Sequence, residues 1–157
     1  MKYLLSVLFL ILCSCGFEED VDLRVDKKKF ISEWNAWKSQ DIKNYSFTLK
    51  EEWLVGDDYE VAIIVKNGIM DSFEYIGKAS NFEPGYTSIS DMYQKIYDEI
   101  KYYENYKTNS ECIPSVRYEM EYHQEFHYIT NFEARYGARS CIGMNGVEIT
   151  VSDFSEN

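Results

Sequence analysis

The chain has 157 residues and carries 27 acidic side chains against 16 basic ones, which gives a formal net charge of −11 at pH 7. Such a balance repels a phosphate backbone and an anionic lipid surface, so it argues against a nucleic-acid partner and against membrane attachment through surface charge. The length favours one domain with a substantial core rather than two.

The first residues have the pattern of an export signal. Lys2 precedes an apolar run from Leu4 to Leu12, and the small residue Ser14 stands directly before Cys15. A basic start, an apolar run and a small residue are typical of a signal peptide, and the run is shorter than the roughly 20 residues that a spanning helix needs. We therefore expect residues 1–14 to be a signal peptide that is removed on export.

The residues around the expected cleavage point, Leu-Cys-Ser-Cys-Gly at 12–16, resemble the lipobox of bacterial lipoproteins. In that family an aliphatic residue stands three positions, and a small residue one position, before the cysteine that receives the lipid. This match assigns lipidation to Cys15 rather than Cys13, and acyl chains contribute about 0.8 kcal/mol per buried CH₂. The resemblance implies a protein held by lipid in the bacterial cell envelope, on the periplasmic or outer face. An ordinary cleaved signal with an incidental cysteine is the alternative.

Two further cysteines, Cys112 and Cys141, remain once Cys13 leaves with the signal and Cys15 is lipidated. Exported proteins commonly oxidise such a pair. A bond between them closes a loop of about 30 residues and adds roughly 3 to 4 kcal/mol in the chain-entropy picture. A redox or metal role lacks the Cys-x-x-Cys spacing, so the favoured interpretation is a structural disulfide.

Residues 15–26 contain the lipidated cysteine and an acidic segment with little periodic hydrophobicity. We expect this segment to be a solvated tether that holds a single domain, residues 27–157, away from the membrane. Binding of Ca²⁺ is less favoured, because the segment has no EF-hand spacing.

The first half of the domain predicts one helix and three strands. Phe30, Trp34 and Trp37 recur at helical spacing over Lys27–Gln40, with Asp26 as N-cap, and this stripe is expected to pack on a sheet rather than hold a ligand. Alternating apolar residues predict strands, and Asn-Gly at 67–68 predicts a type I′ hairpin turn. The strands are expected over Tyr45–Trp53, Tyr59–Lys66 and Ile69–Ile76.

The second half repeats this order after a loop expected over Gly77–Thr87. Ser88 and Asp91 predict the start of a helix running from Ile89 to about Tyr106. Strands are then expected over Val116–Tyr122, Phe126–Ala134 and Val147–Val151, with a connection at Tyr136–Asn145 and a tight turn at Asn145-Gly146.

Both halves together predict an α+β fold, an antiparallel sheet of about six strands with two helices packed on one face. Because each half runs helix, strand, strand, strand, the chain is a candidate for a duplicated α-β-β-β unit, with repeats at Lys27–Ile76 and Ser88–Phe154.

The two histidines, His123 and His127, flank an expected hairpin tip among glutamates. A three-residue loop would place them opposite each other, close enough to share a metal, whereas a two- or four-residue loop would not. The spacing His-Gln-Glu-Phe-His differs from the His-Glu-x-x-His of zinc proteases. Solvated polar histidines are favoured over a metal site.

Other catalytic patterns are not found in the sequence: it has no G-x-S-x-G elbow, no phosphate-binding glycine loop and no Walker-type lysine. We therefore assign no catalytic residue, metal or cofactor. The favoured hypothesis is a non-catalytic module that binds a ligand or an envelope protein; the 17% aromatic content is compatible with a binding patch and equally with a tyrosine-rich core. A hydrolytic or metal-dependent envelope enzyme is the alternative.

Several segments together resemble a bacterial family of small secreted lipoproteins, catalogued as a domain of unknown function. They are the lipobox, the helix with Trp34, and the stretches IKNYSFTL, VAIIVKNGIM, TSISDMYQKIYDEI and VEITVSDF. The resemblance implies a lipid-anchored α+β domain, and it implies no activity, substrate or cofactor.

Overall fold

The computed structural model describes residues 19–77, 83–108, 113–139 and 144–157. Two helices lie in these ranges, α1 (Lys27–Gln40) and α2 (Ile89–Asn105). The strands are β1 (Glu19–Asp20), β2 (Asp22–Arg24), β3 (Tyr45–Trp53), β4 (Tyr59–Lys66), β5 (Ile69–Tyr75), β6 (Lys107–Thr108), β7 (Ile113–Tyr122), β8 (Ile129–Arg139) and β9 (Asn145–Glu156).

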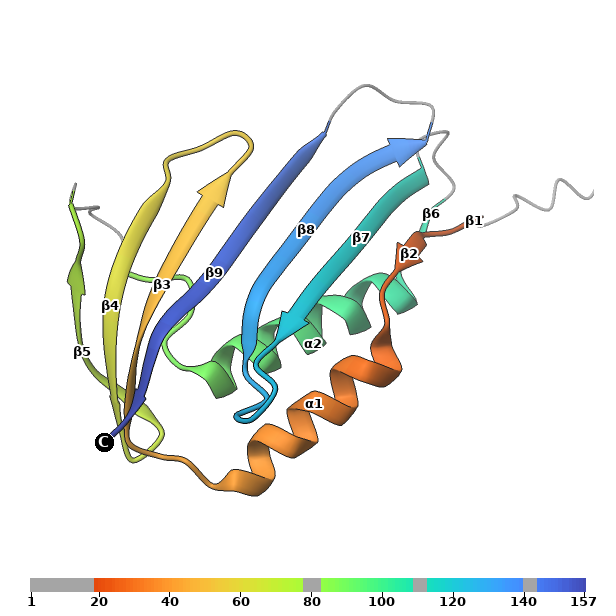
Figure 1. Ribbon diagram of the computed structural model, residues 1–157. Coiled ribbons are helices and arrows are strands. Elements are labelled where there is room, and N and C mark those ends of the chain that lie inside the picture. The colour runs from red at the N-terminus through yellow and green to blue at the C-terminus, as the bar shows by residue number, and fades with distance from the viewer. Residues whose placement is uncertain (1–18, 78–82, 109–112, 140–143) are drawn as a thin grey trace, which may run out of the picture.

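Seven strands form one open sheet in the order β2-β7-β8-β9-β3-β4-β5, and both helices pack on one of its faces (Figure 1). Neighbouring strands are antiparallel except β2 and β7, which run parallel. Strands β1 and β6 pair separately. The predicted α+β class and the mostly antiparallel sheet with two helices are confirmed, and the sheet has one strand more than the six expected.

Helix α1 begins where the sequence predicts. The Asp26 side chain accepts a hydrogen bond from the Lys29 backbone amide at 3.0 Å. This bond satisfies one of the amides of the first turn, which have no partner within the helix. Phe30 and Trp37 are buried, and Trp34 stacks on Tyr93 of α2 with ring centroids 6.0 Å apart. The tryptophan stripe is therefore part of the core.

Helix α2 also has its predicted N-cap, because Ser88 Oγ accepts a hydrogen bond from the Asp91 backbone amide at 3.0 Å. Its apolar stripe faces the same core as α1 and the inner face of the sheet. Trp37 contacts Tyr45 of β3 edge to face at 5.6 Å and donates its indole N–H to Ser90 Oγ at 3.1 Å, which ties α1 to both neighbours. The buried residues of α2 are Ile89, Met92, Tyr93, Ile96 and Ile100.

The first Asn-Gly turn is confirmed. Asn67 and Gly68 join β4 to β5 with φ of 53° and 78°, the left-handed values that a type I′ turn requires at both positions.

The second Asn-Gly prediction is wrong. Asn145 and Gly146 lie inside β9, opposite Tyr136 and Arg135 of β8, and neither has a left-handed φ. Pairing with β8 outweighs the local turn preference, and on the other side the Gly146 carbonyl accepts a hydrogen bond from the Leu54 amide. For the same reason β8 reaches Arg139, through part of the expected connection, and β9 continues past Val151, the expected end of the last strand, to Glu156.

The tether expected over residues 15–26 is corrected at its end, where residues 22–24 form β2 beside β7. Val21, Leu23 and Val25 pack against the core, alternating with charged residues. That alternation is the strand period, and partial burial of three aliphatic side chains outweighs solvation of the charged residues Asp22 and Arg24 between them.

Cys15, Cys112 and Cys141 lie outside the described residues, so lipidation and the disulfide stay predictions. Among the described residues, neither helix is long and apolar enough to cross a membrane.

Candidate functional site

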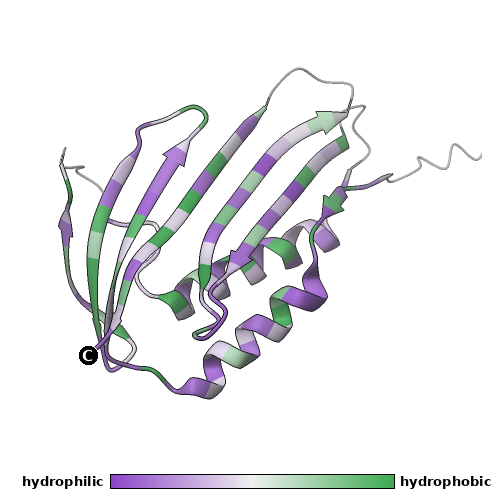
Figure 2. Ribbon diagram, viewed as in Figure 1, coloured by the Kyte–Doolittle hydropathy of each residue, from purple (hydrophilic) through white to green (hydrophobic). Residues whose placement is uncertain are grey.

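The face of the sheet opposite the helices carries charged side chains in rows. Figure 2 shows hydrophilic and hydrophobic residues alternating along β7, β8 and β9, as expected where one face is buried and the other is open. The buried set faces the helices, and the polar set projects from the open face.

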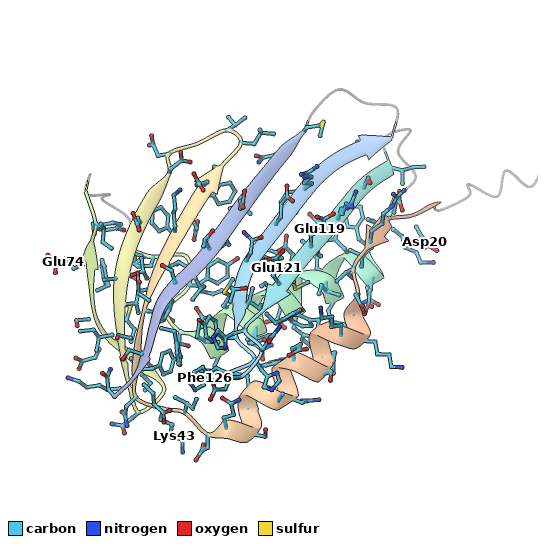
Figure 3. The ribbon with its side chains drawn as sticks, in the orientation of Figure 1. Asp20, Lys43, Glu74, Glu119, Glu121 and Phe126 are labelled. Atoms are coloured by element: carbon cyan, nitrogen blue, oxygen red, sulfur yellow. The ribbon has the colours of Figure 1, made fainter. Side chains whose placement is uncertain are left out.

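Four glutamates are direct neighbours across four adjacent strands of this face. Glu119 of β7 pairs with Glu133 of β8, which pairs with Glu148 of β9, which pairs with Glu52 of β3. Figure 3 shows Glu119 and Glu121 along β7. Like charges directly opposite each other destabilise a sheet, so the row needs compensation from its surroundings.

That compensation comes from residues two positions along the same strands. Arg117 pairs with Glu119, Arg135 pairs with Glu133, and Lys50 pairs with Glu52 at 2.8 Å. Glu148, in the middle of the row, accepts a hydrogen bond from the neutral side-chain amide of Asn131 at 2.9 Å, where the other three glutamates have a basic partner.

At one end of this row the open face is hollowed. The hollow has a volume of about 520 Å³ and lies where β8, β9, β3 and the β3–β4 hairpin meet. Its charged lining consists of Glu52, Asp58, Glu133, Glu148 and Arg135. Its rim carries two strongly exposed apolar side chains, Leu54 (65% exposed) and Met144 (70% exposed), beside Trp53.

The backbone that forms the hollow is held by specific contacts. The Leu54 amide donates to the Gly146 carbonyl at 2.9 Å, and the Trp53 amide donates to Asp58 Oδ1 at 2.9 Å, which fixes the hairpin beside β9. A Cβ on Gly146 would lie 2.9 Å from the Ala134 carbonyl oxygen, closer than side chains approach backbone. Gly146 is therefore needed for close strand packing at the hollow, and not for a turn.

A buried acid lies behind the rim. Glu51 of β3 is 4% exposed and accepts the Trp53 indole N–H at 3.2 Å and the Tyr59 hydroxyl. Burial raises the pKa of the Glu51 carboxyl, and its hydrogen bonds and the nearby Lys95 partly oppose that effect.

Gly85 closes the Glu51 site from the other side. Its amide donates to the Tyr59 hydroxyl at 2.9 Å, and its carbonyl accepts Lys95 Nζ at 2.8 Å. A Cβ at this position would lie 2.6 Å from Glu51 Oε1. The carboxyl is thus enclosed by its own partners and is not part of the hollow's lining.

The two histidines lie at the β7–β8 connection and have separate partners. His123 Nδ1 accepts the amides of Glu125 and Phe126, each at 3.2 Å, while His127 Nδ1 lies 2.8 Å from Glu33 Oε2 of α1. The loop comprises residues 124–127, closed by the His123 amide donating to the Tyr128 carbonyl at 2.8 Å. This is the four-residue alternative, in which a shared metal is not expected.

In the part of the chain that the structure describes, no three side chains of histidine, cysteine, aspartate or glutamate are placed so that together they could hold a metal ion. Comparison of the chain with protein-family models, curated proteins and solved structures found no match.

Local sequence patterns do not identify the residues that form the hollow. Glu52, Glu133 and Glu148 each occupy the polar position of an alternating strand, which is the usual place for a solvated glutamate. Their alignment depends on the registers of two strand pairs, β8 with β9 and β9 with β3, and local sequence patterns contain no information on strand order.

Proposed function

We propose that this chain is a lipid-anchored protein of the bacterial cell envelope and acts as a non-catalytic binding module. The signal pattern and the lipobox around Cys15 support the anchor. The hollow on the open face of the sheet supports binding, and its ligand is a cation with an apolar body, such as an amine on an alkyl or aryl group.

The observation that carries the binding proposal is the combination of charge and apolar surface in one concavity. Four carboxylates against one guanidinium favour a positively charged group, with Glu148 available because its present partner is a neutral amide. Leu54 and Met144 offer apolar area to the rest of the ligand. A lysine side chain of an envelope protein meets both requirements.

A hydrolytic enzyme is less well supported by the geometry. Burial raises the pKa of the Glu51 carboxyl, but this carboxyl is covered by Tyr59 and Gly85 rather than open to the hollow. A catalytic acid must reach its substrate, so this arrangement favours a structural role for Glu51.

The binding proposal predicts that phenylethylammonium, a simple aryl amine, binds in the hollow. We expect the full chain to show NMR shift changes at the amides of Leu54 and Gly146. Replacing Glu148 by Gln should weaken the binding about fivefold to tenfold, because a charge-assisted hydrogen bond becomes a neutral one. Added salt should weaken binding as well.

Two controls make this test specific. Phenylethanol has a similar shape without the charge and should bind more weakly, and Glu74→Gln, at the far edge of the sheet (Figure 3), should leave binding unchanged. Equal binding of the amine and the alcohol, or an unaltered affinity in Glu148→Gln, would contradict the proposal.

The proposed lipid anchor predicts that substitutions of Cys15 and Cys13 have different effects on lipidation. We expect Cys15→Ala to abolish lipidation and to leave the protein out of the detergent phase on Triton X-114 partitioning, with intact mass confirming the absence of acyl chains. Cys13→Ala is the matched control, since that position tolerates small residues in the lipobox, and it should keep the lipid. Lipid retained on Cys15→Ala would refute the assignment.

We also propose that the domain arose from a duplicated α-β-β-β unit. The three strands of the second half, β7-β8-β9, lie directly beside β3-β4-β5 of the first half in one sheet, which is the arrangement that two joined copies would give. Strand β2 lies outside this scheme and is an addition at the edge.

A further inference from the structure

Helix α2 ends in a cluster of tyrosines. The ring of Tyr102 contacts the rings of Tyr103 and Tyr106, with centroid distances of 5.1 Å and 5.5 Å. Tyr103 packs against the core and contacts Tyr136 of β8, whereas Tyr102 is 57% exposed. We call Tyr102, Tyr103 and Tyr106 the tyrosine patch. Its inner ring belongs to the core, and its outer ring faces the surroundings of the protein.

The tyrosine patch lies beside the first strand of the chain. Lys107 and Thr108 of β6 follow Tyr106 directly, and they pair with Asp20 and Glu19 of β1. Paired strands lie about 5 Å apart, so the backbone at Glu19 is next to the end of α2. Figure 1 shows β1 and β6 together at this end of the helix, and Figure 3 labels Asp20 there.

Chain length limits the distance between the tyrosine patch and the lipid. Residues 16–18 are all that separates Cys15 from Glu19, and a segment of this length spans at most about 14 Å, whatever path it takes. Acyl chains on Cys15 hold that residue at the bilayer surface. The end of α2 therefore lies close to the headgroup region, which is about 5 to 8 Å thick on each side of the hydrocarbon core.

The side chains at this end of α2 suit the membrane–water interface. Tyrosine is enriched there because its ring is apolar and its hydroxyl is polar. Glu104 forms ion pairs with Lys27 and Lys101. Lys107 Nζ lies 3.9 Å from Asp20 Oδ1. These pairs contain three lysines and two acids, so they do not repel lipid phosphates as the chain's net charge of −11 would.

A second exposed apolar group, at the tip of the β3–β4 hairpin, fits the bilayer less well. Leu54 and Val55 are 65% and 74% exposed. Three strands lie between β2 and β3 in the sheet, which places the hairpin about 19 Å sideways from the N-terminal strand. Asp57 and Asp58 also follow directly in the hairpin, where they would face lipid phosphates.

We propose that the tyrosine patch docks on the bilayer that holds Cys15, so that the C-terminal end of α2 faces the membrane and the domain is not held away from it. The ring of Tyr102 enters the headgroup region and its hydroxyl stays among the polar groups. This inference rests on the proposed lipid anchor. The short connection to Cys15 keeps the patch at a high local concentration near the lipid, so a small contact suffices.

The acylated protein, reconstituted in phosphatidylcholine nanodiscs, tests this proposal. A nitroxide on the lipid headgroup broadens the NMR signals of nearby amides, and the effect falls steeply with distance. We expect the broadening at the amides of Tyr102 and Tyr106 to exceed that at Ile69 about tenfold or more, because α2 is roughly 25 Å long and Ile69 lies at the opposite end of the sheet.

Three variants separate docking from simple tethering. Tyr102→Ser should lower the broadening at the Tyr106 amide about threefold or more, because serine has no preference for the interface. Tyr102→Trp should keep the broadening, since tryptophan shares that preference. Ile69→Ser, at a side chain that is 73% exposed, is the matched control and should leave the pattern unchanged. Cooperative thermal unfolding checks the fold of each variant.

Intact mass reports the acyl chains, so the anchor and the docking are tested separately. A chain without acyl groups would overturn both proposals. An acylated chain with equal broadening at Tyr102 and Ile69, or with unchanged broadening in Tyr102→Ser, would overturn the docking and leave the anchor in place. Broadening that is strongest at Leu54 and Val55 would also overturn it, because the β3–β4 hairpin would then be the surface on the bilayer.

Discussion

Phe30→Ala is expected to lower the free energy of unfolding by about 3 to 5 kcal/mol. The ring is 0% exposed and lies 5.5 Å from the Tyr93 ring and 6.1 Å from the Trp34 ring. Truncation leaves a cavity between α1 and α2 that these large rings cannot collapse to fill. Domains of this size have a total stability of about 5–15 kcal/mol, so the loss is a large fraction of it.

Urea unfolding followed by tryptophan fluorescence measures this change. Phe30→Leu keeps most of the volume and should cost much less. Val55→Ala, at a side chain that is 74% exposed, should change stability by no more than about 0.5 kcal/mol. If Phe30→Ala and Val55→Ala were equally stable, α1 would not be packed on the core as described.

The helices could be predicted from the sequence because their signals are local. The Asp26 and Ser88 caps and the Phe30–Trp37 stripe each lie within a few turns of one segment, and packing agrees with them. The Asn67-Gly68 turn belongs to the same class, since Asn and Gly readily adopt the left-handed φ that a two-residue type I′ turn requires.

The misassigned segments depend on partners far along the chain. Asn145-Gly146 has the sequence of a turn, yet it forms a strand because Arg135 and Tyr136 pair with it. Residues 22–24 contain two charged side chains, which favour a tether, although the alternation of Val21, Leu23 and Val25 is visible in the sequence. That alternation, given more weight than the charge, is the signal that predicts β2.

The hollow follows from strand order, which no local pattern contains. Once β9 is placed between β8 and β3, Glu133, Glu148 and Glu52 become neighbours. The Glu51 site required a different kind of information, because Gly85 reaches it from a loop and leaves no space for a side chain. A glutamate in a strand gives no sign in sequence of whether its face will be buried.

Glu51→Gln is expected to remove a loss of stability that the wild-type protein suffers as the pH rises. Burial raises the pKa of this carboxyl above its ordinary value of 4.5, so the folded protein binds the proton more tightly than the unfolded chain does. The resulting stability is fully present below pH 4.5 and is lost as the pH rises through the folded pKa. A pKa that is one pH unit higher in the folded protein than in the unfolded chain costs about 1.4 kcal/mol once both states are ionised.

The measurement is the difference in unfolding free energy between Glu51→Gln and wild type, taken by urea titration at pH values from about 4 to 8. This difference should move in favour of the variant as the pH rises, on top of a constant offset from the altered bonds to Tyr59 and Trp53. The hydrogen bond from the Tyr59 hydroxyl lowers the pKa of Glu51. In Tyr59→Phe this pKa should rise, so the pH range over which stability is lost should extend to higher pH. A difference that stays constant across the range would show that the Glu51 carboxyl is hydrated rather than enclosed beneath Gly85.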